Sequence, residues 1–468
     1  MKHAPFPPAA QPAWCWRLAA GLAALGLAAC APMPSTYERP AAPVPPQWPA
    51  GTAAPGAVDA ARTHWRAYFT DPRLQALIAQ ALENNRDMRI AAGRVLEARA
   101  QFGIVKADGL PLVNLLGSGS LGRGNAVLDV SISSVSFELD FWGRVSSLSE
   151  AARASYLATQ EARRAIYISL VADVASAYFT GLQLDELIRI ARATVVLRDK
   201  SAQLIARGRD LGGANDYDFQ QATGALESAR ASLAALEHQR SVTDNLLTYL
   251  VGKTPEGLPP GRPLDAQGLD TALAPGLPAD VLLMRPDVMA SEQRLLAAHA
   301  NIGAARAAFL PKVLLTAGLG LAGPGLASLF KAGAWAFQPV ITMPLFDGGR
   351  AAAAVDIAEA RKIIAVAEYE KTLQLAFREV ADQLSARQSL ARQMQATTAN
   401  TLAQERRLQI AEARYQVGLV GYLDVLDGQR ELVAAQQAIA QTRRAQLESA
   451  VQLYKALGGG SQIEPEAG

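Results

Sequence analysis

The feature that most constrains the fold of this 468-residue chain is an internal repeat. Shifting the sequence by 206 residues superposes Gly143 on Gly349, Gly212 on Gly418 and Gly252 on Gly458. A shift of 200 residues superposes Asp87 on Asp287, Arg94 on Arg294, Gly103 on Gly303 and Pro111 on Pro311. A repeat of this kind builds one structural unit more than once, so it decides the architecture. The sequence therefore predicts a twofold repeat of helix, strands, long helix, tip and return helix.

The first 29 residues have the composition of an export signal. Two basic residues and no acidic ones precede a short apolar run, which ends in Leu-Ala-Ala-Cys30. A basic beginning, an apolar core and small residues before a cleavage point are typical of secretory signals. The final residues resemble the bacterial lipobox, which implies a lipid on the Cys30 thiol; an ordinary signal with an incidental cysteine is the alternative. We predict a signal over residues 1–29 and a lipid-anchored tether over residues 30–70.

Cysteine and charge counts exclude other classes of protein. The cysteines are Cys15 and Cys30, and Cys15 leaves with the signal, so the mature chain needs no internal disulfide. Removal of the signal leaves 43 Lys and Arg against 43 Asp and Glu. A balanced chain gives no reason to expect nucleic acid as a partner. Residues 31–58 are rich in Pro, Ala and Gly, which favours an extended tether over a packed core.

Two segments, at about residues 112–141 and 312–346, alternate as strands do. Their apolar faces are Val113, Leu115, Leu121, Val130, Ile132, Val135, Phe137, Leu139 and Phe141, then Val313, Leu315, Leu319, Leu321, Trp335, Phe337, Ile341, Met343 and Leu345. The phase slips near Ser133 and Ser134, which predicts a bulge. Four strands of ~10 residues fit a membrane barrel, although a half-buried soluble sheet alternates in the same way. Four strands cannot close a barrel alone, and open edges are costly in lipid, so several chains would have to share it.

Two long helices are predicted, from Gly143 to about Arg209 and from Gly349 to Gln416. At ~1.5 Å per residue, each spans ~100 Å. Apolar residues spaced by three and four mark a coiled-coil seam in each helix: Ile166, Leu170, Val174, Ala177, Leu184 and Ile188 in the first, and Leu373, Phe377, Val380 and Leu384 in the second. Shorter helices at 71–107, 214–251, 279–309 and 421–457 are about half as long, so two could lie end to end beside each long helix. A hollow tube and an intermolecular bundle both fit.

The repeat also sets the expected boundaries along the chain. The first structural repeat covers residues 71–260 and the second covers residues 279–460, with a linker at 261–278 between them. A C-terminal tail follows at 461–468.

Asp424 and Asp427 follow the break at Gly418 and Gly421, and their spacing places them on one helix face. A catalytic pair would need a base or a metal ligand nearby, and the sequence offers neither; a plain solvated face is the alternative. The histidines are His3, His64, His238 and His299, and none has a ligand-spaced neighbour. No phosphate loop or nucleophile arrangement occurs in a plausible setting. We therefore expect no enzyme, no metal site and no cofactor beyond the lipid on Cys30.

These residues together resemble the TolC/OprM-like outer membrane factors of tripartite efflux and secretion systems, in particular the NodT-like lipoprotein branch. The resemblance covers nearly the whole mature chain. Its motifs are Leu-Ala-Ala-Cys30, Arg285-Pro286-Asp287, Ile302-Gly303-Ala304-Ala305-Arg306, Pro344-Leu345-Phe346-Asp347-Gly348-Gly349-Arg350 and Tyr422-Leu423-Asp424-Val425-Leu426-Asp427.

The resemblance implies a mainly α fold with a transmembrane β part. Three chains would form a homotrimer, with four strands per chain in a shared twelve-stranded barrel and a long α-helical coiled-coil barrel in the periplasm. The protein would lie in the outer membrane of a Gram-negative cell, anchored by its lipid. It would be the passive exit duct for small toxic molecules, coupled to a periplasmic adaptor and an inner-membrane pump of the resistance-nodulation-division kind.

Several family roles fall on residues of this chain. The resemblance implies adaptor contacts at Leu211, Gly212, Gly213 and Ala214, and at Val417, Gly418 and Leu419. Asp424 and Asp427 match the aspartates that ring the closed periplasmic entrance. Tyr415 and Asp218 match a pair that latches this gate in some members. Some members have a second latch through an Arg, but this chain has Val420 and Tyr217 at those positions. The sequence therefore does not predict which contacts close the gate of this chain.

Two rival functions remain compatible with the sequence. Within the channel class, the chain could serve a type I protein secretion system instead of an efflux pump. In a different class, it could be an anchored coiled-coil structural lipoprotein whose strands form a soluble sheet. The sequence does not name the exported compounds or the partner pump.

Overall fold

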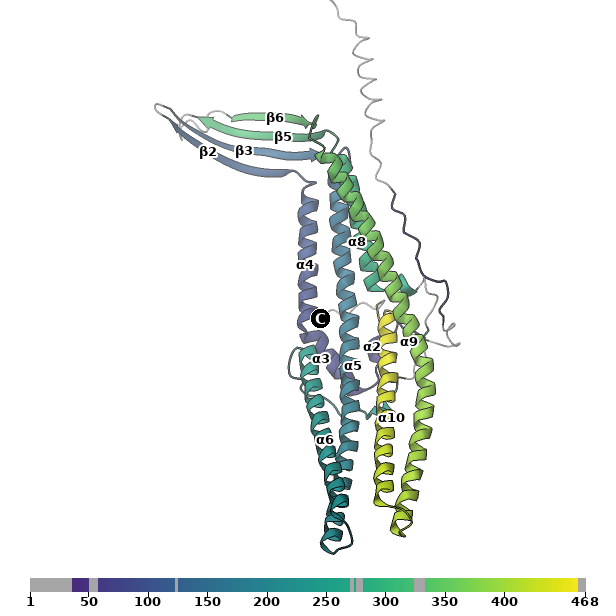
Figure 1. Ribbon diagram of the computed structural model, residues 1–468. Coiled ribbons are helices and arrows are strands. Elements are labelled where there is room, and N and C mark those ends of the chain that lie inside the picture. Colours follow the sequence, from purple (N-terminus) through teal and green to yellow (C-terminus); the bar gives the residue numbers. More distant parts are fainter. Residues whose placement is uncertain are drawn as a thin grey trace, which may run out of the picture. The chain divides into compact units, whose positions relative to one another are not determined.

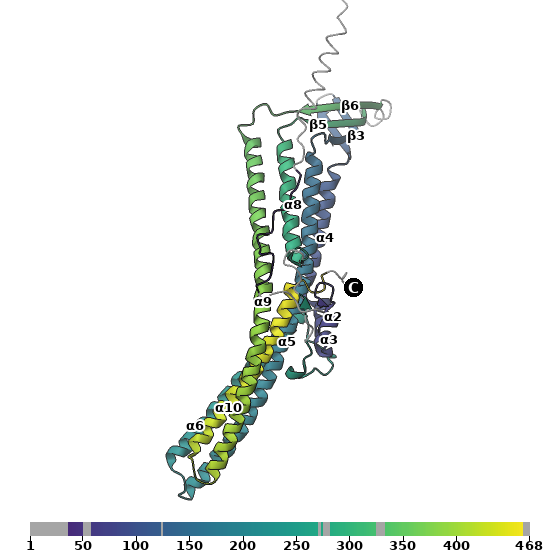
Figure 2. The same ribbon diagram turned by 90° about the vertical axis from the view of Figure 1, so that its right-hand side faces the viewer.

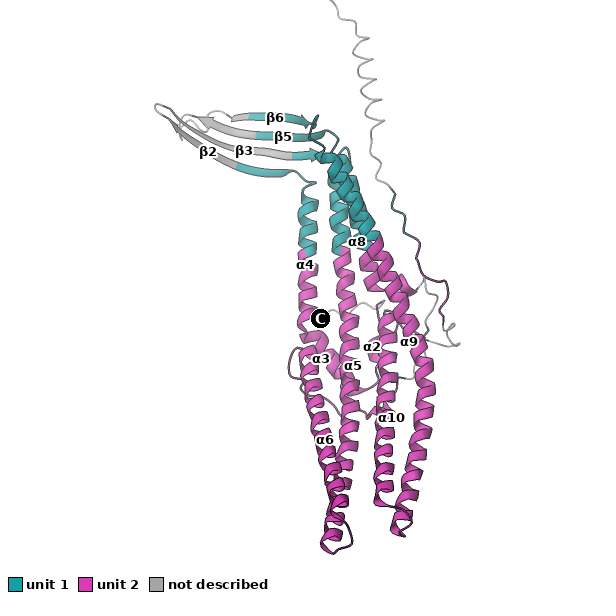
Figure 3. Ribbon diagram, viewed as in Figure 1, with its two compact units in different colours: residues 1–40, 98–156, 293–366 teal, residues 41–97, 157–292, 367–468 magenta. Residues whose placement is uncertain are grey.

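The computed structural model describes residues 36–49, 58–122, 125–269, 273–274, 281–323 and 333–461. The predicted signal, Cys30 and residues 462–468 lie outside the described residues. The chain divides into two compact units (Figure 3), each of which takes segments from both halves of the sequence. Unit 1 comprises residues 1–40, 98–156 and 293–366, and unit 2 comprises residues 41–97, 157–292 and 367–468.

The chain is mainly helical, with long helices and a small sheet (Figure 1). In chain order, the elements are β1 (Val58–Asp59), α2 (Trp65–Tyr68), α3 (Pro72–Asn84), α4 (Arg86–Ala107), β2 (Leu112–Gly122), β3 (Asn125–Leu139), α5 (Arg144–Asp210), α6 (Asp216–Val251), η1 (Leu264–Ala266), β4 (Leu273–Ala274), α8 (Pro286–Ala307), β5 (Lys312–Gly323), β6 (Gly333–Thr342), α9 (Arg350–Gln416) and α10 (Tyr422–Ala456).

Unit 1 contains an antiparallel sheet in the order β2-β3-β5-β6. Its register aligns apolar residues across the strands, as in the row Leu115, Ile132, Leu319 and Trp335, and in the row Leu139, Val313 and Ile341. Paired residues share a face of the sheet, so Leu139, Val313 and Ile341 lie together on one face. The alternation predicted from the sequence is confirmed in this register.

The predicted bulge is also present. The pairing of β3 with β5 shifts between Ile132 and Val135, which are the two residues on either side of the phase slip. A bulge adds a residue to one strand only. It therefore keeps the apolar residues before and after the slip on the same face.

The two long helices match their predicted bounds to within one residue, and each contains 67 residues. Each begins directly after a glycine with positive φ, at 71° for Gly143 and 86° for Gly349. Each is also capped by a preceding aspartate: Asp140 accepts the amides of Val145 and Ser146, and Asp347 accepts those of Gly349 and Ala351. Local turn chemistry thus fixes where both helices start.

The coiled-coil seams form the core of unit 2. The buried seam positions are Leu170, Val174, Ala177, Leu184, Ile188, Leu373, Val380 and Leu384. Both views show α6 beside the C-terminal half of α5, and α10 beside that of α9 (Figures 1 and 2). Among the described helices, α5 alone is long and apolar enough to cross a membrane, but more than half of its most apolar window is buried inside the protein, as in the core helix of a soluble domain.

Two predicted helices are shorter in the structure. The helix expected over 71–107 breaks at Asn85, whose extended backbone separates α3 from α4. The Asn85 side chain accepts the amide of Met88 and donates to the carbonyl of Leu250, so it ends one helix and starts the next. The helix expected over 279–309 is interrupted: residues 281 and 282 are helical, a turn occupies residues 283–285, and α8 begins at Pro286, because proline disfavours helical geometry at the residue before it.

The N-terminal tether and the linker are more closely packed than the sequence indicated. Trp48 is buried and stacks on Phe377 of α9, with ring centroids 4.9 Å apart. The predicted linker contains η1 and β4, and β4 pairs in parallel with β1. The predicted tether also contains β1 and α2, so the extended form expected for residues 30–70 is wrong from residue 58 onward. A Pro-rich composition disfavours regular structure but does not prevent burial of an aromatic residue such as Trp48.

Candidate functional site

The two tips of unit 2 are turns of the same kind. Gly212 follows α5 with φ 77°, and Gly418 follows α9 with φ 75°. The Gly213 amide donates to Gly208 O at 2.7 Å, and the Leu419 amide donates to Arg414 O at 2.9 Å. In both turns a left-handed glycine ends a helix, which is a common C-terminal cap. Nothing lies within 4 Å of a Cβ added at either glycine. Within the chain, the left-handed backbone therefore explains these two glycines.

The predicted adaptor contacts gather on these two turns. The side chains of Leu211, Val417 and Leu419 are exposed, at 88%, 69% and 68% of their full area. Gly212, Gly213, Ala214 and Gly418 complete the turns. Exposed aliphatic residues at the ends of helices are free to contact another protein.

The helices that leave the two tips start differently. At α6, the side chain of Asn215 accepts the amide of Asp218 at 2.8 Å. At α10, the cap position is Gly421, which has no side chain to offer. Asp424 lies in the first turn of α10, where a carboxylate stabilises the exposed amides of the helix end. The α10 end therefore relies on Asp424 more than the α6 end relies on any one aspartate.

Asp424 and Asp427 have different surroundings despite their shared face. Asp424 is exposed, and no ion pair forms to it among the described residues. Asp427 is half-buried; its Oδ2 lies 2.5 Å from Arg407 Nη2 of α9, and its Oδ1 lies 2.7 Å from Arg430 Nη2. Asp427 thus joins the two helices of its own hairpin, while the carboxylate of Asp424 is available to solvent.

The predicted latch residues are not joined in the described part of the chain. Tyr415 packs against Tyr422, with ring centroids 5.6 Å apart. Asp218 is held by the cap at Asn215, and no hydrogen bond joins it to Tyr415 in this single chain. A basic residue, Arg209, lies at the α5–α6 tip near Asp218. Its Cζ lies 4.0 Å from the centroid of the Phe219 ring, and its Nη1 lies 3.6 Å from Oδ1 of Asp216.

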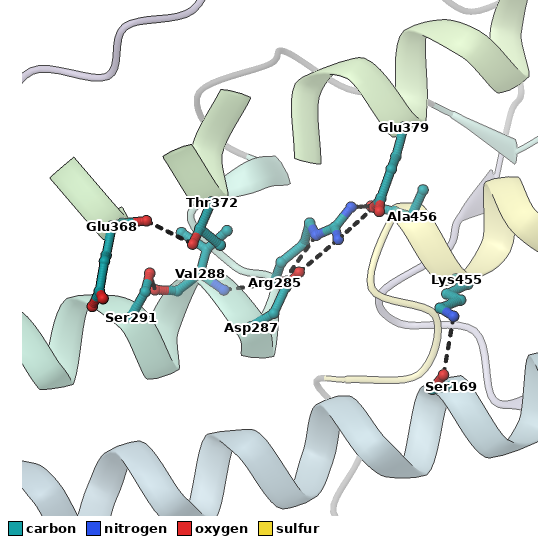
Figure 4. Close-up of polar contacts among 10 residues, drawn as sticks. All are labelled: Ser169, Arg285, Asp287, Val288, Ser291, Glu368, Thr372, Glu379, Lys455 and Ala456. Carbon is teal, nitrogen blue, oxygen red and sulfur yellow. Dashed lines mark hydrogen bonds and ion pairs between the residues drawn. The ribbon is translucent and has the colours of Figure 1, made fainter. Parts of the chain in front are cut away.

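A second polar site lies where the second repeat begins (Figure 4). The buried guanidinium of Arg285 donates to Asp287 through two nitrogens, at 3.0 and 2.7 Å. It also reaches Glu379 of α9 at 2.8 Å and the carbonyl of Ala456, at the end of α10, at 2.8 Å. Burial opposes the charge of Asp287, but the hydrogen bonds and charge of Arg285 hold its pKa below the ordinary value. One side chain therefore ties together the start of α8, the middle of α9 and the end of α10.

The first repeat has a neutral version of this contact. Asn85 donates to the carbonyl of Leu250 at 2.8 Å. Under the two sequence shifts, Asn85 corresponds to Arg285 and Leu250 corresponds to Ala456. The twofold repeat therefore extends to individual hydrogen bonds, with an amide in one copy and a guanidinium in the other.

A third polar site is centred on Asp71. Asp71 is the N-cap of α3, since its Oδ1 accepts the amides of Arg73 and Leu74 at 2.8 and 3.4 Å. Its Oδ2 accepts three further bonds, from the Tyr178 hydroxyl, the Arg262 amide and the Gln267 side chain, at 2.8, 2.9 and 2.7 Å. Burial raises the pKa of Asp71, but these hydrogen bonds outweigh it and hold the pKa below its ordinary value. Asp71 thus fixes the predicted linker to α3 and α5.

Sequence reasoning missed the wider roles of three residues in unit 2. Arg285 was recognised only as part of a motif, and Asp71 only as a residue at the start of the helix expected over 71–107. Arg198, a buried cation on α5, was not singled out at all. A charged residue at seam spacing was the available signal. Among the described residues, no group of His, Cys, Asp and Glu is arranged to hold a metal ion.

Comparisons with known proteins agree with this geometry. The family model "Outer membrane efflux protein" matches residues 77–253 and 277–459. The chain is 41% identical over 452 residues to the cation efflux system protein CusC of Escherichia coli O6:H1, covering 94% of this chain and 97% of that one. It is 41% identical over 466 residues to the probable efflux pump outer membrane protein TtgC of Pseudomonas putida, covering 95% of each.

A solved structure shares the fold. The open state of the MtrE outer membrane channel of Neisseria gonorrhoeae superposes with a TM-score of 0.85 at 36% identity, covering 92% of this chain and 98% of that one.

Proposed function

The chain belongs to the outer membrane efflux protein family, and from that premise we propose that it is the trimeric exit duct of a tripartite pump that exports small molecules. It is an outer membrane efflux channel and a transport protein, not an enzyme. The homotrimer, the adaptor, the pump of the resistance-nodulation-division kind and the range of small toxic compounds are parts of the proposal. An energised pump and adaptor supply selection and work, and this chain supplies the passage.

The main observation in support of the proposed trimer is the four-stranded sheet of unit 1, whose two outer strands have unpaired edges in the described chain. Strands β2 and β6 are its outer strands, and each pairs with one neighbour. Trp335, Phe337 and Ile341 of β6 share one face and are exposed, at 78%, 59% and 70%. In a bilayer, an apolar face needs lipid and an unpaired edge needs another strand. Three chains with four strands each would pair every edge in a barrel of twelve strands.

Apolar residues left uncovered on the helices support the same assembly. Helix α4 buries Ala91 alone and exposes Ile90, Leu96 and Ile104. Helix α9 exposes Ile357, Ile363 and Ile364. Exposed aliphatic residues in this number on long helices are typical of surfaces that another subunit covers. We assign these faces to contacts between the chains of the helical barrel.

Lipidation at Cys30 fits the first contact of the described chain. Tyr37 packs edge to face on His299 of α8, with centroids 5.9 Å apart. The seven residues from Cys30 to Tyr37 span at most ~25 Å, and the eight from His299 to Ala307, where α8 ends, rise ~12 Å. A lipid on Cys30 would therefore reach the level at which β5 begins. This supports an anchor in the membrane leaflet beside the barrel.

The α9–α10 tip supplies the periplasmic entrance in this proposal. We assign the charge of the entrance to Asp424, because its carboxylate is exposed and unpaired among the described residues. Asp427 contributes by holding α10 on α9 through Arg407. The latch roles of Tyr415 and Asp218 would require the hairpins to approach more closely in the trimer.

The test is single-channel recording of the purified protein in planar bilayers, next to its migration on gels with and without boiling. We expect a trimer that resists dissociation until boiled and a small current that prefers cations. A folded trimer with no current under any voltage would contradict the channel. A monomer with no current would favour the alternative of an anchored coiled-coil structural lipoprotein.

A further inference from the structure

One buried charge interrupts the apolar seam of α5. Ala191, Arg198 and Ile205 follow one another at intervals of seven residues, and all three are buried. Positions at this spacing face the partner helix of a coiled coil, where apolar residues are normal. Arg198 is 8% exposed. A cation in this stripe weakens the packing unless its hydrogen bonds are complete.

The hydrogen bonds of Arg198 are not complete in the described chain. Its Nη2 donates one long bond, of 3.5 Å, to the carbonyl of Leu426 on α10. Its Nη1 is buried and has no hydrogen-bond partner. The guanidinium has five N–H donors, so most of its bonding capacity is unused where α10 covers it.

Polar groups on the facing surface of α10 also lack hydrogen-bond partners in the part of the chain that the structure describes. The hydroxyl of Tyr422 lies near Arg198 and Ser201, but it is buried and makes no bond of acceptable geometry with any described residue. On the same helix, Oε1 of Gln429 is also buried without a partner. Burial disfavours the cation and lowers the pKa of Arg198, and Tyr422 offsets this only in part. Polar atoms buried without partners destabilise the arrangement that buries them.

The buried polar groups of Arg198, Tyr422 and Gln429, here called the Arg198 cluster, lie next to the proposed periplasmic entrance. Tyr422 and Leu426 lie in the first two turns of α10, on either side of Asp424 in the sequence. Water would complete the bonds of Arg198 once α10 moved away from α5. In this structure, the packing of α10 on α5 is therefore weakest in the turns of α10 that surround Asp424.

We propose that Arg198 is a positioning residue of the periplasmic entrance, which loosens the packing of α10 on α5 and so keeps the entrance ready to open. This inference rests on the proposed channel function. It concerns the ease of opening and not the path through the open channel.

The experiment counts openings per minute in long bilayer recordings of the full-length trimer. Arg198→Met replaces the cation with an apolar side chain of similar length, so it should stabilise the closed packing and reduce openings roughly tenfold. Arg198→Lys keeps a buried cation and should open nearly as often as the wild type. Ion selectivity of the openings that remain should not change.

Gln404→Met is the matched control, because Gln404 occupies the equivalent position of α9 under the 206-residue shift and is uncharged. It should leave the frequency of openings unchanged. Tyr422→Phe removes only the unpartnered hydroxyl and should reduce openings in the same direction as Arg198→Met. It decides the matter if Arg198→Met does not assemble.

More frequent openings in Arg198→Met or in Tyr422→Phe would mean that the cluster fastens the entrance, and would overturn the inference. Unchanged openings in both would do the same. A wild-type trimer without any current would overturn the channel function together with this inference, whereas a conducting wild type beside unchanged variants would overturn the inference alone.

Discussion

Asp424 and Asp427 illustrate how far spacing predicts the role of a residue. Their separation of three residues predicts a common helix face, and the structure agrees. It does not predict that Arg407 and Arg430 neutralise only the second of them. Arg407 is 20 residues away in the sequence and meets Asp427 because the hairpin folds back at Gly418.

In the proposed trimer, we expect the exposed carboxylate of Asp424 to bind cations at the periplasmic entrance. Asp424→Ala should weaken block of the channel by Mg²⁺ on the periplasmic side roughly tenfold, because it removes an exposed charge near the threefold axis. The control is Asp427→Ala/Arg407→Ala, which removes an ion pair at constant net charge and should be blocked like the wild type. Loss of block in the control alone would transfer the role to Asp427.

Asp71 offers a test of stability and its pH dependence. Asp71→Asn should lower the free energy of unfolding by about 3 kcal/mol, because an amide nitrogen would face other donors. Since the folded state depresses the pKa of Asp71, its contribution is complete above the unfolded value of about 4 and is lost as the pH falls through the folded value. Thermal midpoints of the two proteins should therefore converge in acid. A difference that persists unchanged at low pH would rule out the ionised carboxylate as the cause.

At the scale of elements, the turns were predictable and the contacts between helices were not. Gly143, Gly212 and Gly252, with their counterparts at 349, 418 and 458, all have positive φ. They were visible as interruptions of helical periodicity, because the left-handed region favours glycine. The break at Asn85 was missed because asparagine is tolerated within helices, and its reason is a carbonyl of Leu250 that is 165 residues away in the sequence.

The tip glycine can be tested against a neighbour of the same turn. Gly418→Ala should destabilise the protein by about 1–2 kcal/mol, because L-residues are strained at φ 75°. Gly421→Ala is the control, since its φ is −76° and the nearest atom to an added Cβ is 4.0 Å away. Thermal unfolding followed by circular dichroism compares the two. Equal midpoints would mean that the turn adapts without strain.

The two junctions of the repeat should differ in strength. Arg285→Met leaves Asp287 and Glu379 without their shared cation, and should cost about 3 kcal/mol. Asn85→Ala loses neutral hydrogen bonds and should cost about 1.5 kcal/mol. Thermal midpoints of the detergent-solubilised proteins give the order. The reverse order would indicate that burial of the charge cancels the benefit of its hydrogen bonds.

At the scale of the whole molecule, the sequence predicted more of the architecture than of its chemistry. Apolar alternation, the phase slip at Ser133 and Ser134 and the seam of Leu170 and Val174 follow from local periods, and all reappear in the structure. The polar sites at Asp71, Arg198 and Arg285 depend on residues brought together by the fold, so no local period predicts their partners. The burial of Trp48 belongs to the same class.

Lipidation at Cys30 is a prediction about how the whole molecule is held at the membrane. Cys30→Ala should abolish incorporation of labelled palmitate in cells and leave the protein in the outer membrane, because the proposed twelve-stranded barrel would hold it there without the lipid. Cys15→Ala is the control, since Cys15 would be removed with the signal, and it should be labelled like the wild type. Labelling that persists in Cys30→Ala would place the lipid on another group.

The carbonyls of Leu250 and Ala456 occupy equivalent positions of the two repeats and bear on how the repeat arose. The same backbone position is bound twice, by Asn85 in one copy and by Arg285 in the other. This is the trace expected when a gene encoding one unit is duplicated in tandem and the two halves then diverge in side-chain chemistry while they keep their geometry. In a trimer of the duplicated chain, six units surround the axis. In the proposed trimer, carrying two units on one chain halves the number of chains that must assemble around the passage, from six to three.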